Sequence, residues 1–372
     1  GDPARLYLEG GQELICQDIE FDLPTGKITL TGPGMIGQGV SGGDGGLGME
    51  GLGESSGASS IGWQDEAIAT IATGQRVGAD GELEEFRYFD NAIFYEDVVL
   101  TQNGPAMEAL GSDIGEEEMP DYDFLRCDVM RVWMRPTEGT SILPESAVAQ
   151  GNVVANMQDL LVHAGSVDVL FDEVATEDED GEESMELQLA FIVARDNVHV
   201  VDQTNPDEPA EAHAALTQLD VVGQRAVLFG TSETPASISQ GENILSGNEI
   251  TLNQKTTSAL VNGAGTMRLV TDTDLNGKDL EEPRPIDVAW SERMEYFGQK
   301  NQVNFIGDVD MVSVSETMKC QQLRIVFTEA VDEDAADASA NDELAAAEDG
   351  PPEDEPQMGL DIQRYGKREL SM

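Results

Sequence analysis

Three stretches of the chain share one alternation of apolar and polar positions and overlay without a gap: residues 16–32, 247–263 and 291–307. In the first, Ile19 and Phe21 precede a polar turn, and Ile28 and Leu30 follow it before a closing glycine. The corresponding residues are Ile250, Leu252, Ala259 and Val261 in the second stretch and Met294, Tyr296, Val303 and Phe305 in the third. Apolar residues at every second position, interrupted by a polar turn, indicate a half-buried β-hairpin. A repeated hairpin predicts units that bury their apolar faces on their neighbours.

Degenerate copies of the opening strand bring its occurrences to seven. The residue that begins each copy is Cys16, Cys127, Ala164, Leu216, Gly247, Ser291 or Cys320. Because this position mostly holds small residues, we expect it to be a packing position, with its cysteines buried and unreactive. Outside an alanine-rich acidic stretch near the C-terminus, the chain has no sustained helical period. The sequence therefore predicts an all-β antiparallel jelly roll of repeated hairpins, with no helix longer than about three turns in residues 147–327.

The predicted organisation has three parts. Residues 1–140 form a β-rich region with a flexible glycine-rich insertion at 33–62, since glycine at this density disfavours regular structure. The segment RPTEGTSILP (135–144) interrupts the strand pattern and marks the boundary to a second β-region, 141–328. Residues 329–372 are predicted to be a disordered acidic tail, because Ala, Asp, Glu and Pro bury too little apolar surface to offset the entropy of ordering.

The charge of the chain limits the kinds of partner that it can bind. Twenty basic residues stand against 73 acidic ones, for a net charge of −53. This balance repels nucleic acid, whose binding relies on clustered Lys and Arg, and opposes docking on an anionic membrane surface. No apolar run approaches the ~18 residues that span a bilayer, so a membrane-spanning protein is not expected. Solubility in a salty environment is the favoured explanation of the charge; a surface rich in divalent cations is the alternative.

No arrangement of residues predicts catalysis or a cofactor. The chain has neither a nucleophile elbow nor a zinc-protease motif. Its three histidines, His163, His199 and His213, have no Cys or His at metal-ligand spacing, and we predict that they are ordinary strand or loop residues. The segment 272–279 (DTDLNGKD) matches the front half of a calcium loop, but Pro283 stands at the twelfth position, where a bidentate Glu is expected. A polar hairpin loop is the favoured interpretation there, and calcium binding is the alternative.

One family shares the repeat. The segment 291–327 (SERMEYFGQKNQVNFIGDVDMVSVSETMKCQQLRIVF) resembles the OstA-like, LptA-type β-jelly rolls of lipopolysaccharide transport. In the family's pattern, a strand, a polar turn and a second strand are followed by Gly-Asn-Val or Gly-Asp-Val. Residues 307–309 and 151–153 have this closing sequence. Residues 32–34 and 263–265 match the closing signature more loosely. The resemblance covers residues 147–327 best and the first part of the chain less well.

The resemblance implies a non-enzymatic protein of the periplasm or cell envelope, with acyl chains lying in an open groove between two sheets. Its expected partners are lipopolysaccharide or a related amphiphile and, by edge-to-edge β-pairing, other envelope transport proteins. Carried over by position, the groove residues are Ile19, Phe21, Ile28, Leu30, Ile250, Leu252, Met294, Tyr296, Val303, Phe305, Leu323 and Ile325. The same alternation would also serve to pack two sheets, so a salt-adapted structural or protein-interaction scaffold without a lipid ligand is the second hypothesis.

Overall fold

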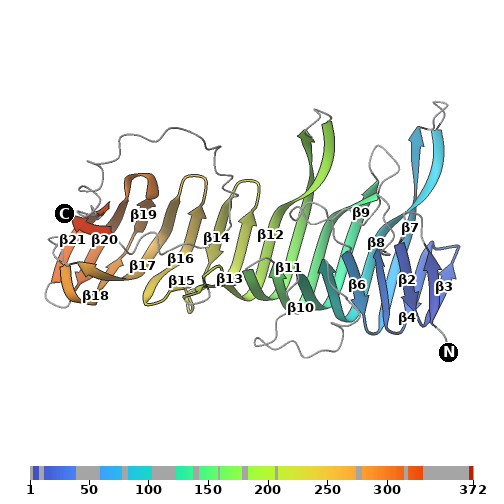
Figure 1. Cartoon of the computed structure of the whole chain (residues 1–372), viewed down its shortest axis with the longest axis horizontal. Helices are drawn as coiled ribbons and strands as arrows, with labels where there is room; N and C mark the ends of the chain where they lie inside the picture. The colour runs from blue at the N-terminus through green and yellow to red at the C-terminus, as the bar shows by residue number, and fades with distance from the viewer. Residues whose placement is uncertain are drawn as a thin grey trace, which may run out of the picture. The chain divides into compact units, whose positions relative to one another are not determined.

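A computed structural model describes residues 3–7, 12–38, 59–77, 83–102, 123–136, 142–157, 160–177, 183–205, 208–273, 279–313, 317–329 and 368–371. Nearly all of them lie in β-strands, and the strand pairs are antiparallel. The helical structure in these residues is one 3₁₀ turn, Gly298–Lys300. The prediction of an all-β antiparallel fold is confirmed (Figure 1). No helix in the described residues is long and apolar enough to cross a membrane.

The chain divides into two compact units. The first comprises residues 1–201 and 213–229, and the second comprises residues 202–212 and 230–372. The strands through the first unit are β1 (Ala4–Tyr7), β2 (Gln12–Cys16), β3 (Asp18–Asp22), β4 (Lys27–Thr31), β5 (Gly34–Gln38), β6 (Ser59–Trp63), β7 (Glu66–Val77), β8 (Leu83–Gln102), β9 (Phe124–Pro136), β10 (Ile142–Met157), β11 (Leu160–Glu177), β12 (Glu183–Asp202), β13 (Ala210–Asp220) and β14 (Arg225–Phe229). Those of the second unit are β15 (Ala236–Gln240), β16 (Asn243–Asn253), β17 (Ser258–Thr273), β18 (Asp279–Trp290), β19 (Arg293–Phe297), β20 (Gln302–Val312), β21 (Thr317–Glu329) and β22 (Arg368–Ser371).

This division differs from the boundary expected at residues 140/141. Strands β9 and β10 lie on either side of that point and pair along most of their length, from Ile142 opposite Pro136 to Asn156 opposite Phe124. The Pro- and Gly-containing segment between them therefore connects two neighbouring strands of one sheet. Proline and glycine mark a turn as readily as a domain linker, and the sequence alone did not distinguish the two.

The three overlaid stretches form three equivalent hairpins. In β3–β4, Ile19 lies opposite Leu30 and Phe21 opposite Ile28. In β16–β17, the pairs are Ile250 with Val261 and Leu252 with Ala259; in β19–β20, they are Met294 with Phe305 and Tyr296 with Val303. The predicted register is therefore confirmed in each copy. The polar turn fixes the pairing, and a slip of one residue would move every apolar side chain to the opposite face of the sheet.

Long strands bend at corners made by two successive residues with positive φ. Gly151-Asn152 (φ 77° and 46°) and Gly307-Asp308 (84° and 40°) are the corners of β10 and β20. The register shifts at both corners. Glu96-Asp97 (56° and 47°) and Asp196-Asn197 (66° and 57°) have the same backbone without glycine. Asn and Asp tolerate this left-handed conformation better than other non-glycine residues do, so a search for glycine missed the latter two corners.

A buried valine follows each of these corners. Val98, Val153, Val198 and Val309 are no more than 2% exposed. Three of them lie opposite a residue of the small repeat position: Val98 opposite Cys127, Val153 opposite Ala164 and Val309 opposite Cys320. The small residue leaves room for the valine where the strand turns, which explains why Cys and Ala occupy this position.

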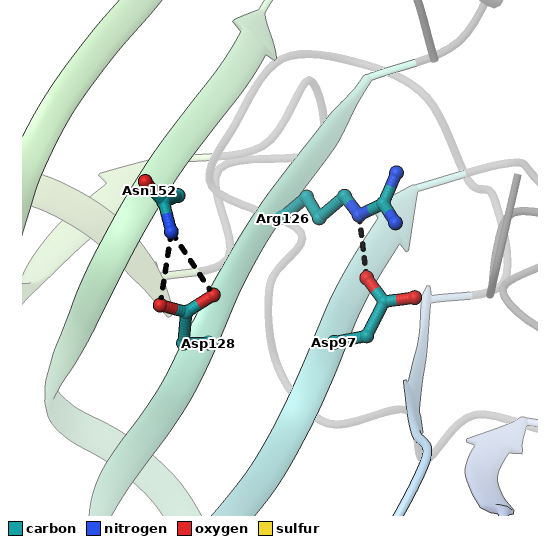
Figure 2. A network of polar contacts seen from close by, with 4 residues as sticks. All are labelled: Asp97, Arg126, Asp128 and Asn152. Carbon is teal, nitrogen blue, oxygen red and sulfur yellow. Dashed lines mark hydrogen bonds and ion pairs between the residues drawn. The ribbon is translucent and has the colours of Figure 1, made fainter. Parts of the chain in front are cut away.

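Side chains of β9 bind the corners of both neighbouring strands (Figure 2). Arg126 Nε donates to Asp97 Oδ1 at 2.5 Å, and Asn152 Nδ2 donates to both carboxylate oxygens of Asp128 at 3.4 and 3.1 Å. In β20, the corner residue Asp308 accepts a hydrogen bond from Gln321 Nε2 at 2.7 Å. These contacts are partly exposed, so each contributes little to stability by itself. They hold residues whose backbone conformation is otherwise unfavourable.

Each unit contains a tryptophan that packs directly over a glycine. A Cβ atom on Gly34 would lie 2.2 Å from the ring of Trp63, and one on Gly265 would lie 2.4 Å from the ring of Trp290. Each indole also meets a phenylalanine at an interplanar angle of 45°, Trp63 with Phe94 and Trp290 with Phe305. The two units therefore use the same aromatic arrangement, in which glycine is needed for close approach.

Two regions predicted to lack structure contain strands. Within the expected flexible insertion, β5 and β6 pair with each other, Gly34 lying opposite Trp63. Here glycine serves to admit the tryptophan ring, while residues 39–58 lie outside the described residues. In the predicted tail, β22 pairs with β21, Phe327 lying opposite Leu370. The rest of the tail, and residues 274–278 of the calcium-like segment, also lie outside the described residues; Thr273 and Asp279 on either side of that segment pair as a β-hairpin.

The buried cysteines are expected to resist alkylation in the folded protein. Burial raises the pKa of the Cys127 thiol to about 12, and burial also raises the pKa of the Cys16 thiol. At pH 8 the thiolate fraction of Cys127 should be more than about 100-fold below that of an exposed cysteine. Peptide mapping after iodoacetamide treatment should show slow labelling of Cys127 in the native chain and fast labelling in denaturant. Equal rates in the two states would contradict the burial of this position.

Candidate functional site

In the second unit, the candidate groove residues form two rows across the sheet. One row runs from Ile250 through Val261, Met294 and Phe305 to Leu323, on strands β16, β17, β19, β20 and β21. The adjacent row runs from Leu252 through Ala259, Tyr296 and Val303 to Ile325 on the same strands. Residues two apart on a strand share a face, so the rows make one continuous apolar surface. All eight candidates of this unit belong to it.

The first unit repeats this arrangement. Its first row consists of Ile19, Leu30, Ala67, Phe94, Met130, Ala149 and Val167. Its second row consists of Phe21, Ile28, Ala69, Ala92, Val132, Ala147 and Val169. The remaining four candidates begin these rows. The later members on β7–β11 were not among the predicted groove residues. The repeat there is degenerate, and Ala67, Ala69, Ala92, Ala147 and Ala149 stand where the clearer copies mostly have larger apolar residues.

Most of the candidate residues are buried inside the protein. The buried ones are Ile28, Leu30, Ile250, Met294, Tyr296, Val303, Phe305, Leu323 and Ile325. Ile19 and Leu252 are half-buried, and Phe21, at the start of its row, is 51% exposed. The first row of each unit is thus covered along most of its length. The second row is more accessible: Phe21 is exposed, and Ala92, Val132, Ala147, Val169, Leu252 and Ala259 are half-buried.

A second layer of strand segments covers the rows in the second unit. Strand β17 pairs with β19 through residues 258–262 and with β18 through residues 265–273, so it passes from one layer to the other at its corner. Strand β20 does the same, pairing with β19 before Gly307 and with β18 after Asp308. Trp290, on the covering layer, meets Phe305 with ring centroids 5.2 Å apart. The interior is therefore an apolar space between two layers, closed at the corner by aromatic contact.

The outer face of the covering layer has a different character. A shallow depression of about 420 Å³ is lined by Ile244, Thr266, Met267, Arg268, Asp287, Val288, Ala289, Asp310 and Val312. Arg268 donates to both carboxylate oxygens of Asp287 at 2.8 and 3.3 Å, and this contact raises the pKa of the guanidinium. Arg268, Asp287 and Asp310 bring charge into a depression whose other lining residues are mostly apolar.

The histidines were predicted to be ordinary strand or loop residues; all three lie on strands, and the structure brings them together. The rings of His163 and His199 are stacked with centroids 6.1 Å apart, and those of His199 and His213 with centroids 4.2 Å apart. The sequence did not indicate this proximity, because the three residues lie on different strands, β11, β12 and β13. Metal-ligand spacing along a chain detects sites within a loop or helix and does not detect neighbours across a sheet.

The fold and its apolar interior have counterparts among known proteins. Repeated antiparallel hairpins with glycine corners and an apolar interior define the chain as an all-β jelly-roll protein. Residues 140–258 match the family model LptD_N, described as LptA/(LptD N-terminal domain) LPS transport protein. This part of the chain is therefore similar to the LptA/LptD N-terminal lipopolysaccharide-transport family, the family that the repeat resembles. The match covers less than half of the chain.

A solved structure and the curated proteins complete the comparison. The crystal structure of LptH, the LptA-homologous periplasmic component of the lipopolysaccharide transport device of Pseudomonas aeruginosa, matches at 17% identity and a TM-score of 0.23. The match covers 36% of this chain and 81% of LptH. Comparison with curated protein sequences gave no match.

Proposed function

We propose that this protein is a non-enzymatic carrier of the cell envelope that binds the acyl chains of lipopolysaccharide, or of a related amphiphile, between its two β-layers. The observation that carries the proposal is the pair of continuous apolar rows, which repeats in both units at the same register. An acyl chain needs a long apolar surface without buried polar groups, and these rows supply one. The family match at residues 140–258 supports the periplasm or cell envelope as the location.

Ligand entry requires the layers to separate or the chain to enter from an end of a row. Phe21, at the start of the first unit's second row, is exposed, and the half-buried Ala92, Val132, Ala147 and Val169 continue the accessible part of this row. Burial of an acyl chain stabilises the complex by about 0.8 kcal/mol for each CH₂ group. A chain of ordinary length therefore provides enough free energy to offset a modest opening of the sandwich.

The charge of the protein affects which headgroup is accepted. A net charge of −53 repels the phosphates of lipopolysaccharide unless salt screens the repulsion or divalent cations bridge the charges. Binding of lipopolysaccharide should therefore increase with Mg²⁺, whereas binding of a neutral amphiphile such as monoolein should not. This difference distinguishes the two classes of ligand.

Photocrosslinking tests the proposal directly. Tyr296→benzoylphenylalanine places a larger aromatic probe in the second row, while Glu295→benzoylphenylalanine places the same probe on the opposite face of β19. With lipopolysaccharide and Mg²⁺, or with monoolein, the variant at Tyr296 should form a lipid adduct and the variant at Glu295 should not. Absence of an adduct at Tyr296 with both lipids, or equal adducts at the two positions, would refute binding between the layers.

The burial of the rows favours a second candidate function, a structural or protein-interaction scaffold. Phe305 is 0% exposed and Ile250 is 0% exposed, so the protein's own side chains fill this part of the interior. A scaffold would keep this core closed and would show no lipid adduct at Tyr296 under any condition. The same crosslinking experiment therefore separates the scaffold from the carrier.

A further inference from the structure

We propose that His199 and His213 form a binding site for a transition-metal ion of the Zn²⁺ class. The two imidazole rings are nearly parallel, with an interplanar angle of 8° and centroids 4.2 Å apart. One ring nitrogen of His199 and one ring nitrogen of His213 lie within 4.8 Å of each other. Two histidine nitrogens bound tetrahedrally to Zn²⁺ are about 3.3 Å apart, since each bond is about 2.0–2.1 Å. To bind one ion, the two rings must turn out of their parallel stack so that their in-plane lone pairs converge on it.

The site lies on the outer face of the sheet. Next to His199, Val198 belongs to the buried core of the first unit; next to His213, Ala214 packs against the same core. Because side chains alternate along a strand, the two imidazoles point away from that core. His213 is exposed, so an ion can reach the pair from solvent. Glu211, two residues before His213 on β13, offers a carboxylate on the same face of its strand.

The chemistry of these groups indicates which ion binds. Neutral imidazole is a ligand for Zn²⁺, Cu²⁺, Ni²⁺ and Fe²⁺, whereas Mg²⁺ and Ca²⁺ prefer carboxylate, carbonyl and water oxygens. The 73 acidic residues attract cations of every kind to the surface. The carboxylates bind all these cations, whereas the histidine pair binds transition-metal ions in preference to Mg²⁺ and Ca²⁺. This inference is independent of the proposed lipid binding.

His163 provides a matched control within the same stack. Its ring lies 6.1 Å from that of His199, so it continues the stack on the side away from His213. Its buried Nε2 has no hydrogen-bond partner among the described residues. We assign His163 a packing role beside the metal ligands, and its replacement should leave the ion in place.

Metal titration of the full-length protein tests this assignment. With excess Mg²⁺ to occupy the surface carboxylates, calorimetry with ZnCl₂ should show one Zn²⁺ ion bound per chain. The ¹⁵N-imidazole spectrum contains only three histidines, and Zn²⁺ should shift the signals of His199 and His213 more than that of His163. His199→Asn and His213→Asn should each weaken Zn²⁺ binding by at least about tenfold. Loss of a residue that only orients a metal ligand already lowers metal affinity by about that much, and loss of the ligand itself should cost at least as much. His163→Asn should retain it.

Three results would overturn the proposal. Zn²⁺ binding unchanged in both His199→Asn and His213→Asn would assign the ion to surface carboxylates. Failure of the wild-type protein to bind Zn²⁺ in the presence of Mg²⁺ would exclude a selective site. Equal loss in His163→Asn would contradict its assignment as a non-ligand. Because His213 is exposed, His213→Asn should keep the fold, and circular dichroism of each variant verifies this.

Discussion

Replacement of Phe305 by aspartate is expected to unfold the second unit. Phe305 is 0% exposed, lies between Met294 and Leu323 in its row, and packs against Trp290. The substitution removes the ring contacts and buries a carboxylate without a partner, at a combined cost of more than about 4 kcal/mol. Domains are stable by only about 5–15 kcal/mol, so this loss removes most of the stability of the unit. Urea denaturation followed by tryptophan fluorescence measures it.

Phe297→Asp is the matched control for this prediction. Phe297 belongs to β19 in the same unit and is 36% exposed, with Lys300 over its ring at 5.6 Å. Water reaches a carboxylate there, so the loss should stay below about 1.5 kcal/mol. A Phe305→Asp protein as stable as this control would show that the layers open readily in solution. That result would favour the carrier over the scaffold, because a hydrated carboxylate requires an open groove.

Gly265→Ala is expected to destabilise the same unit by about 3 kcal/mol, the upper end of the range for overpacked cores. The new Cβ would lie 2.4 Å from the ring of Trp290 and 2.5 Å from the backbone oxygen of Ser246. A side chain can rotate away from such a contact, but the oxygen of a paired strand cannot move without distorting the sheet. The midpoint of urea denaturation should therefore fall clearly.

Gly263→Ala separates steric contact from backbone strain. Gly263 is two residues away on β17 and has φ +85°, but the nearest atom to its added Cβ is Asn248 Nδ2 at 3.9 Å. It should lose only about 1–2 kcal/mol, the cost of a left-handed conformation for a residue with a Cβ. If Gly263→Ala were the more damaging substitution, the packing of Trp290 over Gly265 would not be the reason for glycine at position 265.

The hairpin register was predictable because it depends on local patterns. Each copy contains its own alternation and its own turn, and the pairs Met294–Phe305 and Tyr296–Val303 follow from these alone. The Gly-Asn and Gly-Asp corners were predictable for the same reason, since glycine marks a positive φ in the sequence. The corner at Glu96-Asp97 was missed because its conformation is imposed by the pairing of β8 with two different strands.

The extent of the apolar rows could be predicted only in part. The sequence identified Ile28 and Leu30 at the start of the first unit's rows, but not Ala67 or Ala149 further along them. Alanine is common on both faces of a sheet. Only the residue opposite it on the neighbouring strand shows that it faces the interior. Burial also depends on partners, and the sequence could not show that the covering layer leaves Phe305 without exposure.

The sequence by itself determined the all-β class, the hairpin repeat and the face on which apolar residues lie, because strand alternation and turn chemistry act over a few residues. Only the tertiary structure decided that Gly34 and Gly265 admit a tryptophan ring, and that the two layers enclose the rows. It also decided that His199, near the end of β12, and His213, near the start of β13, stack with their ring centroids 4.2 Å apart. Such contacts join residues that are distant along the chain. Their geometry is set by which strands become neighbours, and no local pattern in the sequence carries that information.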